Sequence, residues 1–268
     1  MAAPENYTRV LQESQDVFHR FPLQLVHGIP LMEPIAQQWG PIEHFQARPD
    51  DLLISTYPKA GTTWMQEIVD LILVRGDVEK ASRAPTHVRI PFLEICSPPP
   101  VPSGVQLLAN VPSPRVIKTH LPFQLVPKSF WENRCKVIYV ARNAKDNVVS
   151  YYFFDQMNRT QPEPGPWELY LQKFMDGKLA WGSWYDHVCR YWAERASHCI
   201  LYVFYEDMKE RLQSPESEPT GLSNPAPAPR ASLSTWTQRQ QEPPEVQHER
   251  RESRDRMRLL DSYRLKKS

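Results

Sequence analysis

Residues 51–74 read DLLISTYPKAGTTWMQEIVDLILV, and this stretch decides the predicted fold. Residues 52–54 form a short apolar run typical of a buried strand in a parallel sheet. Pro58 then ends the strand ladder, and Gly61 permits a sharp turn of the backbone. From Thr62 onward the apolar spacing becomes helical. The apolar side of this helix is predicted to comprise Met65, Ile68, Val69, Ile72 and Leu73.

The loop between the strand and the helix is predicted to bind an anion. A helix that begins at Thr62 or Thr63 directs its free N–H groups and the positive end of its dipole at the loop. Lys59 adds a full charge and the threonines add hydroxyl donors, which favours a phosphate. The order of a Walker A loop is absent, because Lys59 precedes Gly61. The alternative is an ordinary capped helix with an incidental lysine nearby.

Composition narrows the classes of protein. The chain has 268 residues, a net charge of +1 and 41% hydrophobic residues, which suits one large α/β domain or two smaller ones. This charge gives no reason to expect a nucleic-acid partner. No basic segment precedes an apolar one at the N-terminus, and no apolar run approaches a membrane span, so we expect no membrane partner and a cytoplasmic location. The four cysteines lack metal-binding spacing, and Cys135, in a predicted strand, is expected to be a buried free thiol.

Strand and helix patterns alternate along the chain. Predicted strands cover residues 52–54, 115–119, 136–141 and 200–204. One predicted helix begins after residue 142 and runs through residue 152, and two others cover residues 167–175 and 182–196. A short strand or hairpin followed by a short helix is expected within residues 21–39. This alternation predicts an α/β fold, with a parallel sheet flanked by helices and right-handed crossovers.

Charged and polar side chains lie at the ends of four of the predicted strands. These are Lys59, Lys118 with His120, Arg142 and Tyr205. Because ligands of parallel sheets lie beyond the carboxyl ends of the strands, we expect these side chains to share one site.

Three of the residues near these strand ends have candidate roles. His120 is a candidate general base, since its ordinary pKa near 6.5 suits proton transfer near neutral pH; the alternative is a structural histidine. Arg142 offers a bidentate cation for a second phosphate, with the Ser150 hydroxyl nearby in sequence. Trp64 could stack on a flat ring such as adenine or belong to the core.

Four strings carry a family resemblance: TYPKAGTTW, IKTHLP, VIYVARNAKDNVVSYY and LYVFYEDMKE. They resemble the cytosolic sulfotransferases, most closely the phenol (aryl) sulfotransferases, over about residues 22–210. The resemblance implies a fold related to the P-loop kinases. It also implies transfer of a sulfonate group from 3′-phosphoadenosine 5′-phosphosulfate (PAPS) to a phenol or similar small hydroxylated acceptor, without a metal.

The resemblance also implies roles for individual residues. The loop Lys59, Ala60, Gly61, Thr62, Thr63 and Trp64 would surround the 5′-phosphosulfate, with Lys59 neutralising the leaving oxygen and Trp64 near adenine. Arg142 and Ser150 would hold the 3′-phosphate, and Tyr205 would contact adenine. His120 would take the proton of the phenol and Lys118 would help to hold the transferring group, while Phe92 and Phe154 would line an apolar acceptor pocket.

The resemblance ends near Glu210. Residues 211–268 lack the family's R-K-G-x-x-G-D-W-K cofactor loop and its K-x-x-x-T-V-x-x-x-E homodimer motif, and they are rich in proline and charge. We therefore expect a sulfotransferase domain over residues 1–210 that is incomplete at its C-terminal end, and a disordered tail over 211–268. Two lost charge-assisted hydrogen bonds would weaken donor binding by about two to four decades, so poor or absent activity is expected.

Two alternative functions remain open. An inactive variant or nucleotide-binding decoy would keep part of the site without turnover. A small-molecule kinase with a related fold would need a lysine after the glycine and a hydroxyl that holds a metal, for which Thr62 alone is a weak substitute.

Overall fold

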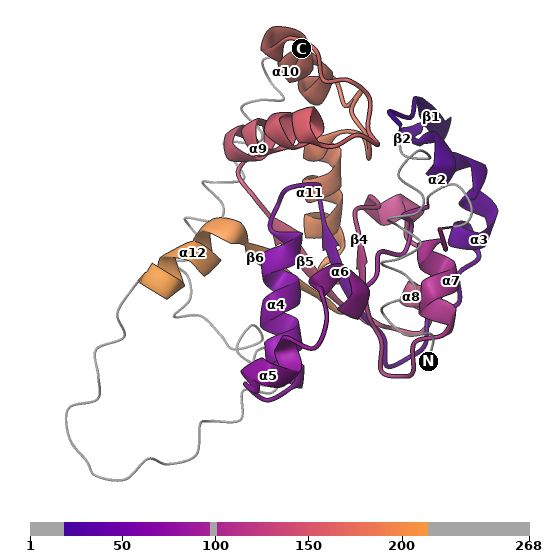
Figure 1. Cartoon of the computed structure of the whole chain (residues 1–268), viewed down its shortest axis with the longest axis vertical. Helices are drawn as coiled ribbons and strands as arrows, with labels where there is room; N and C mark the ends of the chain where they lie inside the picture. The colour runs from indigo at the N-terminus through magenta and orange to yellow at the C-terminus, as the bar shows by residue number, and fades with distance from the viewer. Residues whose placement is uncertain (1–18, 97–100, 214–268) are drawn as a thin grey trace. The chain divides into compact units, whose positions relative to one another are not determined.

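A computed structural model describes residues 19–96 and 101–213 of the chain (Figure 1). Its centre is a four-stranded parallel sheet in the order β4-β3-β5-β6. The strands are β3 (Leu52–Thr56), β4 (Val116–Thr119), β5 (Lys136–Ala141) and β6 (Ile200–Phe204). The predicted parallel sheet is therefore confirmed, and two of its strands, β5 and β6, have the predicted bounds.

Helices flank the sheet and connect its strands. The longer ones are α4 (Thr62–Leu73), α9 (Ala144–Met157), α10 (Trp167–Met175), α11 (Trp184–Glu194) and α12 (Tyr205–Gln213). Shorter elements are α2 (Glu33–Gln37), α3 (Trp39–Glu43), α5 (Val78–Ala81), α6 (Thr86–Arg89), α7 (Gly104–Ala109), η2 (Phe123–Leu125) and α8 (Lys128–Glu132). The predicted hairpin is present as β1 (Leu23–Val26) and β2 (Ile29–Met32), which pair antiparallel ahead of α2.

The face of the sheet beneath α11 is polar and aromatic. Tyr139 of β5 stacks on Tyr191 of α11 with ring centroids 4.2 Å apart, and its hydroxyl lies 2.7 Å from Nδ1 of His187. Ser55 of β3, which faces Tyr139 across the ladder, donates to the Tyr191 hydroxyl at 2.8 Å. Buried polar groups with matched partners hold a unique packing arrangement. Specific hydrogen bonds, as well as apolar contacts, therefore fix the position of α11 on the sheet.

The predicted apolar side of α4 is wrong in its last turn. Met65 and Val69 are buried, but Ile72 is 38% exposed and Leu73 is 52% exposed. Asp70 is buried instead, at 2% exposure. The reason is electrostatic, because Asp70 pairs with arginines that lie beyond the helix, and the polar network described next takes the place of apolar packing.

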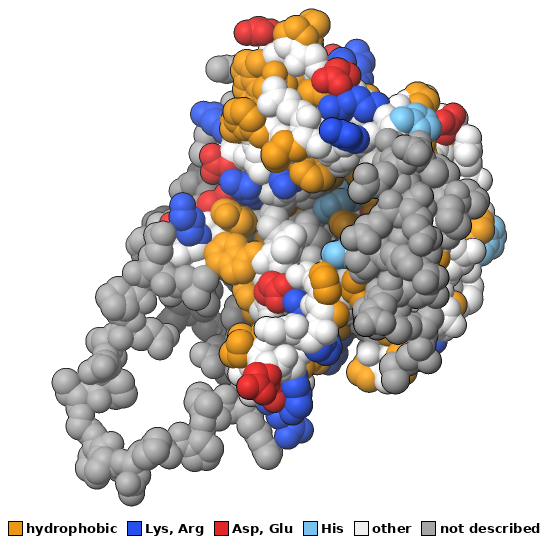
Figure 2. Space-filling model, in the orientation of Figure 1, with side chains coloured by type: hydrophobic (Ala, Val, Ile, Leu, Met, Phe, Trp, Pro, Cys, Tyr) orange, Lys and Arg blue, Asp and Glu red, His pale blue; other side chains and the backbone are white. Residues whose placement is uncertain are grey.

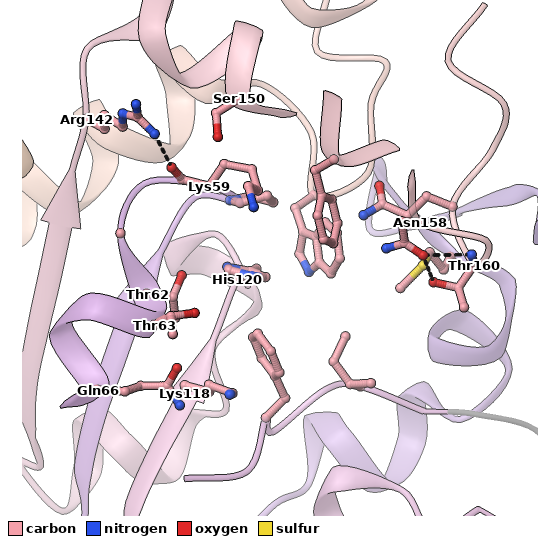
Figure 3. Close-up of a pocket in the computed structure, with 18 of the residues that line it drawn as sticks. Lys59, Thr62, Thr63, Gln66, Lys118, His120, Arg142, Ser150, Asn158 and Thr160 are labelled. Carbon is pink, nitrogen blue, oxygen red and sulfur yellow. Dashed lines mark hydrogen bonds between the residues drawn. The ribbon is translucent and has the colours of Figure 1, made fainter. Parts of the chain in front are cut away.

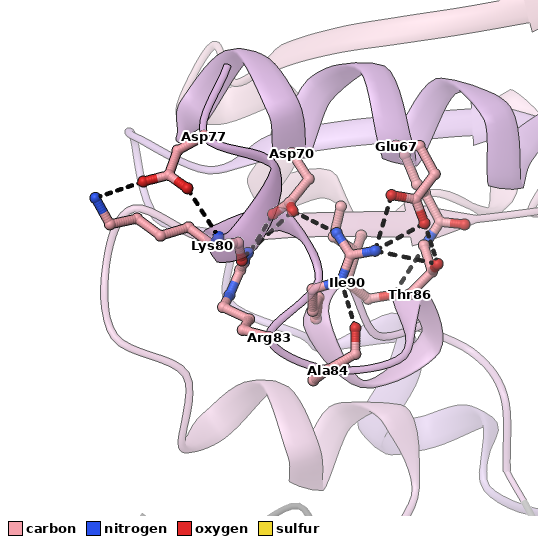
Figure 4. Close-up of polar contacts among 10 residues, drawn as sticks. Glu67, Asp70, Asp77, Lys80, Arg83, Ala84, Thr86 and Ile90 are labelled. Carbon is pink, nitrogen blue, oxygen red and sulfur yellow. Dashed lines mark hydrogen bonds and ion pairs between the residues drawn. The ribbon is translucent and has the colours of Figure 1, made fainter. Parts of the chain in front are cut away.

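This network joins α4 to α5 and α6 (Figure 4). Asp70 accepts from Arg83 at 2.7 Å and also pairs with Arg89. Arg89 in turn lies 2.7 Å from Glu67, and Thr86 donates to the same carboxylate. A buried carboxylate needs such pairing to offset its lost hydration. The network fixes α6 against α4, and Gln66 of α4 also donates to the Ile90 carbonyl directly after α6, at 3.3 Å.

A buried ion pair joins the starts of β3 and β4. Arg115 donates to both carboxylate oxygens of Asp51, at 2.9 and 2.6 Å, and their side chains are 3% and 0% exposed. Asp51 also accepts from the Arg48 N–H at 2.8 Å, and Leu52 N–H donates to the Arg115 carbonyl at 2.9 Å. Bidentate geometry of this kind fixes the alignment of the two strands.

Cys135 is a buried free thiol, as predicted, but it directly precedes β5 instead of lying in the strand. Burial, helped by the charge of nearby Asp51, raises the pKa of this thiol to about 11. The thiol is therefore protonated near neutral pH, which makes it chemically inert.

The surface carries charges of both signs. Figure 2 shows basic and acidic side chains interspersed on one face, with hydrophobic side chains exposed over α9 and α10. Exposed apolar residues of these helices include Phe153, Met157 and Leu169. Within the described ranges, no helix combines the length and apolar character that crossing a membrane requires. The predicted disordered tail at residues 211–268 and the incomplete C-terminal end lie almost entirely outside the described residues, so both stay predictions.

Removing Asp51 is expected to destabilise the fold strongly. In Asp51→Ala the Arg115 guanidinium stays buried without its partner, which costs about 3–5 kcal/mol in the free energy of unfolding. Urea denaturation followed by circular dichroism measures this loss. Lys178→Ala, which breaks an exposed ion pair to Asp176, is the control and should cost less than about 1 kcal/mol. Equal losses in the two variants would contradict the role of the buried pair.

Candidate functional site

A cavity of about 950 Å³ lies at the carboxyl ends of the sheet strands (Figure 3). Of the residues predicted from the sequence, it is lined by Lys59, Gly61, Thr62, Thr63, Trp64, Phe92, Lys118, His120, Arg142, Ser150, Phe154 and Tyr205. Ala60 alone of the predicted set lies outside this lining. It is fully buried, and its N–H donates to the Tyr57 carbonyl at 3.1 Å, so this amide is already used within the turn.

The loop between β3 and α4 has an unusual backbone. Lys59 has φ +68° and Gly61 has φ +111°, both in the left-handed region. A Cβ on Gly61 would lie 2.8 Å from the Tyr205 ring, so a side chain there would displace the aromatic wall. The loop is held by Arg142, which donates to the Lys59 carbonyl at 3.0 Å, and by Asn147, which donates to the Pro58 carbonyl at 2.7 Å. The loop is thus fixed before any ligand binds.

Three cationic side chains converge on the cavity. Lys59, Lys118 and Arg142 come from three strand ends, and none of them forms an ion pair with a described residue. Burial and then the charge of Arg142 lower the pKa of Lys59, and burial lowers the pKa of Lys118 to about 8. Nε of Arg142 is buried without a hydrogen-bond partner among the described residues. Unpaired cations and an unused donor fit a bound anion.

Aromatic rings surround the Arg142 end of the cavity. The Tyr205 ring lies edge-on to Trp64 at 5.2 Å, and the Arg142 guanidinium sits 4.5 Å over Tyr205. Ser150 of α9 lies beside Arg142 in Figure 3. The Thr62 hydroxyl lies 2.6 Å from that of Thr56, and either of the two can be the donor. The hydroxyl available at the helix start is that of Thr63, which lines the cavity.

His120 has a defined tautomer. Its Nδ1 lies 2.8 Å from the Thr56 carbonyl, which can only accept, so Nδ1 carries the hydrogen and Nε2 carries the lone pair. Among the described residues, Nε2 makes no hydrogen bond. Burial first, and then neighbouring charges, lower the pKa of His120 to about 3, so the imidazole is neutral near pH 7. The arrangement presents an unprotonated nitrogen to the cavity.

Two buried residues that the sequence did not single out support His120. Glu94 is fully buried and accepts from the Thr119 hydroxyl at 2.9 Å and from the His120 N–H at 2.7 Å. Burial raises the pKa of Glu94 to about 6. His187 donates from Nε2 to the His120 carbonyl at 3.0 Å, since a carbonyl can only accept, and its Nδ1 therefore accepts from the Tyr139 hydroxyl. The backbone of His120 is therefore held from two sides.

Apolar rings form the wall around His120. Phe92 and Trp181 lie 4.8 and 5.2 Å from the imidazole, and the ammonium of Lys118 sits 4.4 Å over Phe92. The Phe92 segment pairs with β4, since Lys118 N–H donates to the Pro91 carbonyl at 3.1 Å. The polar network of α4 and α6 fixes that segment, as described above. An acceptor here would meet aromatic surface on two sides of the base.

Several lining residues were missed by sequence reasoning. They are Phe21, Met32, Pro34, Pro58, Gln66, Ile95, Cys96, Asn158, Thr160, Gln161 and Trp181. Apart from Pro58, which lies in the loop after β3, none of them lies at a strand end of the parallel sheet, and most reach the cavity from loops and from the N-terminal hairpin. For Glu94, which supports His120, the sequence did contain a signal: in the string Phe92-Leu93-Glu94 an acidic residue lies two positions after a predicted lining residue.

A family model described as "Sulfotransferase domain" matches residues 49–215. The chain is 58% identical over 195 residues to Sulfotransferase 1 family member D1 of Mus musculus, covering 73% of this chain and 65% of that protein. It is 55% identical over 191 residues to Sulfotransferase 1A1 of Bos taurus, covering 71% and 64%. The chain thus spans about 65% of the length of these curated relatives.

Solved structures share the fold. The crystal structure of mouse sulfotransferase SULT7A1 complexed with PAP matches with TM-score 0.58 at 29% identity, covering 71% of this chain and 64% of that one. Retinol dehydratase in complex with retinol and PAP matches with TM-score 0.64 at 24% identity, covering 78% and 70%, and this likeness concerns the fold alone. Within residues 19–96 and 101–213, no group of three His, Cys, Asp or Glu side chains is placed to hold a metal ion.

The His120 imidazole is expected to stay neutral from about pH 8 to about pH 5. Its folded pKa of about 3 lies below the unfolded value near 6.5, so the unfolded chain binds the proton first. The contribution of His120 to the free energy of unfolding therefore falls as the pH drops from about 6.5 toward 3. Nitrogen NMR chemical shifts measure the titration, with His120→Gln to assign the signal and the urea-unfolded chain as reference. Protonation of the folded imidazole between about pH 6 and 7 would contradict the assignment.

Proposed function

Because the chain belongs to the sulfotransferase family, we propose that it transfers a sulfonate group from PAPS to the hydroxyl of a phenol or similar small acceptor. The observation that carries the proposal is one cavity that holds three unpaired cations beside a neutral histidine with a free Nε2. A donor with several negative charges needs the cations, and a hydroxyl acceptor needs the base.

The donor half of the proposed site is the loop and the Arg142 end. The first free N–H groups of α4, together with Lys59, would surround the 5′-phosphosulfate. Lys59 would neutralise charge on the bridging oxygen as the bond to sulfur breaks, which leaves adenosine 3′,5′-bisphosphate (PAP). Arg142 and Ser150 would hold the 3′-phosphate, and the unpartnered Nε of Arg142 supports that role. Mouse SULT7A1 was crystallised as a complex with PAP, which agrees with this nucleotide.

Adenine is assigned to the aromatic pair of Trp64 and Tyr205. A purine can stack on an aromatic side chain, and such stacking contributes about 1–3 kcal/mol per base to the binding free energy. The left-handed Gly61 lets the loop approach Tyr205 closely, so the nucleotide end and the phosphosulfate end are linked through one turn.

The acceptor half of the proposed site is His120 with its apolar walls. A phenol oxygen would attack sulfur, and its proton would pass to Nε2 of His120 as the new S–O bond forms. The acidity of the hydroxyl rises during attack, so a neutral imidazole of low pKa can still receive the proton. Lys118 would hold an oxygen of the transferring sulfonate, while Phe92 and Phe154 would exclude water from the acceptor.

Two other functions stay as alternatives with distinct signatures. A nucleotide-binding decoy would bind PAP but transfer nothing, as expected if the cofactor loop absent from residues 211–268 is essential. A small-molecule kinase would need Mg²⁺ and ATP, and the order of the loop disfavours it, because Lys59 precedes Gly61, whereas a P-loop has its lysine after the glycine.

Replacing the proposed base tests the mechanism. Purified chain is expected to sulfonate a simple phenol from PAPS without Mg²⁺, but slowly, because residues 211–268 lack the family's cofactor loop, and His120→Gln should lower this kcat by about 10²–10⁴-fold. The affinity for PAP should stay within about twofold, since His120 lies on the acceptor side. His44→Gln makes the same chemical change on the surface and serves as the control.

Three outcomes would overturn parts of the proposal. Comparable kcat in His120→Gln and wild type would remove His120 as the base. PAP binding without turnover in the wild type would establish the decoy. Phosphoryl transfer from ATP that requires Mg²⁺ would establish the kinase.

A further inference from the structure

The cavity has a polar patch away from the proposed reacting groups. Asn158, Thr160 and Gln161 line it, and Figure 3 shows Asn158 and Thr160 across the cavity from Lys59 and His120. Asn158 directly follows α9 as its C-cap, and its N–H donates to the Phe154 carbonyl at 2.7 Å. No role in the proposed transfer has been given to these three side chains.

The amide of Asn158 has a fixed orientation. Its Oδ1 accepts from the Thr160 N–H at 2.8 Å and from the Thr160 hydroxyl at 2.7 Å. A backbone N–H can only donate, so the atom facing Thr160 must be the oxygen, and Nδ2 is the remaining group. Figure 3 shows this nitrogen on the cavity side. Among the described residues Nδ2 has no hydrogen-bond partner.

Gln161, three residues further along the chain, adds a second amide to the lining of the cavity. Its side chain is 3% exposed, and Oε1 accepts from the Tyr151 hydroxyl at 2.8 Å. Nε2 makes no hydrogen bond with a described residue, although the residue lines the cavity. An N–H donor that faces a cavity and has no protein partner is available to a ligand or to water. Two amide nitrogens therefore face the same cavity with their oxygens already used.

The segment that carries these amides is rigid. Arg20 donates to the backbone carbonyls of Asp155, Gln161 and Pro162, at 2.9, 3.0 and 3.2 Å. Phe21 N–H donates to the Thr160 carbonyl at 3.2 Å. Groups held in place before binding lose little entropy when a ligand arrives. The two donors are thus preorganised.

We propose that Asn158 and Gln161 form a donor-only subsite that selects acceptors carrying a carbonyl or carboxylate oxygen away from the reacting hydroxyl. This inference rests on the proposed function and names its preferred acceptor class. The amides of Asn158 and Gln161 offer four N–H hydrogens, since their oxygens accept from Thr160 and Tyr151, so a ligand oxygen is matched better than an ammonium. The nearby cations Lys59 and Lys118 also repel an ammonium. An alkyl group would leave both amides unpaired.

The test compares two isosteric phenols. One has a para side chain with a ketone two methylenes from the ring, and the other has a branched alkyl group of the same shape, so that the acidity of the phenol is unchanged. Calorimetry measures their Kd values for the chain in the presence of PAP. The wild type is expected to bind the ketone about 3–10-fold more tightly than the alkyl compound, which corresponds to one or more neutral hydrogen bonds.

Asn158→Asp replaces the Nδ2 donor of the subsite by an acceptor oxygen and keeps the shape of the side chain. Its Oδ1 still accepts from Thr160, but an oxygen replaces Nδ2, so the preference for the ketone should fall to about unity or reverse. Gln156→Glu is the matched control, since it makes the same charge change on an exposed position of α9 and should keep the wild-type ratio. Thermal unfolding of each variant reports whether it folds, and Asn158→Leu replaces Asn158→Asp if the latter does not.

The outcomes separate this inference from the proposed function. Equal binding of the two phenols by the wild type, or an unchanged preference in the Asn158 variants, would overturn the subsite. Tight, ketone-selective binding without sulfonate transfer would support the subsite while overturning the proposed activity, because binding is measured without turnover.

Discussion

The constraint on which the site depends is the convergence of Lys59, Lys118 and Arg142 at one edge of a parallel sheet. Like charges in a half-buried cavity repel one another and lose hydration, and both effects lower the pKa of Lys59. No described carboxylate forms an ion pair with any of the three. A bound polyanion would offset this cost by neutralising the three cations, so we expect ligand binding to stabilise the fold.

Strand pairing and a few side-chain bonds to the strands and the loop hold these cations in place. The parallel register aligns the ends of β4, β3 and β5, and the Asp51–Arg115 pair fixes the opposite ends of β3 and β4. At the site itself, the Arg142 bond to the Lys59 carbonyl ties the end of β5 to the loop after β3. Thr56, whose carbonyl fixes the tautomer of His120, is also the last residue of β3. One strand therefore sets the positions of both halves of the site.

The sequence predicted the parts of this arrangement that depend on local patterns. The strands at residues 136–141 and 200–204 were predictable because fully buried parallel strands give continuous apolar runs. The convergence of Lys59, Lys118, His120 and Arg142 followed from strand-end topology. Their individual roles came from a family resemblance, and these roles remain proposals.

The missed features depend on contacts between distant segments. Glu94 and His187 reach His120 from a loop and from α11, and no local spacing shows this. The exposed last turn of α4 was mispredicted because Asp70 finds arginines from a later segment, which periodicity cannot show. The orientations of the Asn158 and Gln161 amides likewise depend on hydrogen bonds from Thr160 and Tyr151 to their oxygens.

The most direct test of the anion-completed cavity is the shift in Tm on adding PAP in the presence of a metal chelator. At a concentration of about 100 times Kd, binding stabilises the folded chain by about 2.7 kcal/mol, which raises Tm by about 5–10 °C for a domain of this size. Arg142→Gln should lose most of this shift, while Arg75→Gln, an exposed arginine, should keep it. No shift in the wild type, or the same shift in Arg142→Gln, would contradict the account.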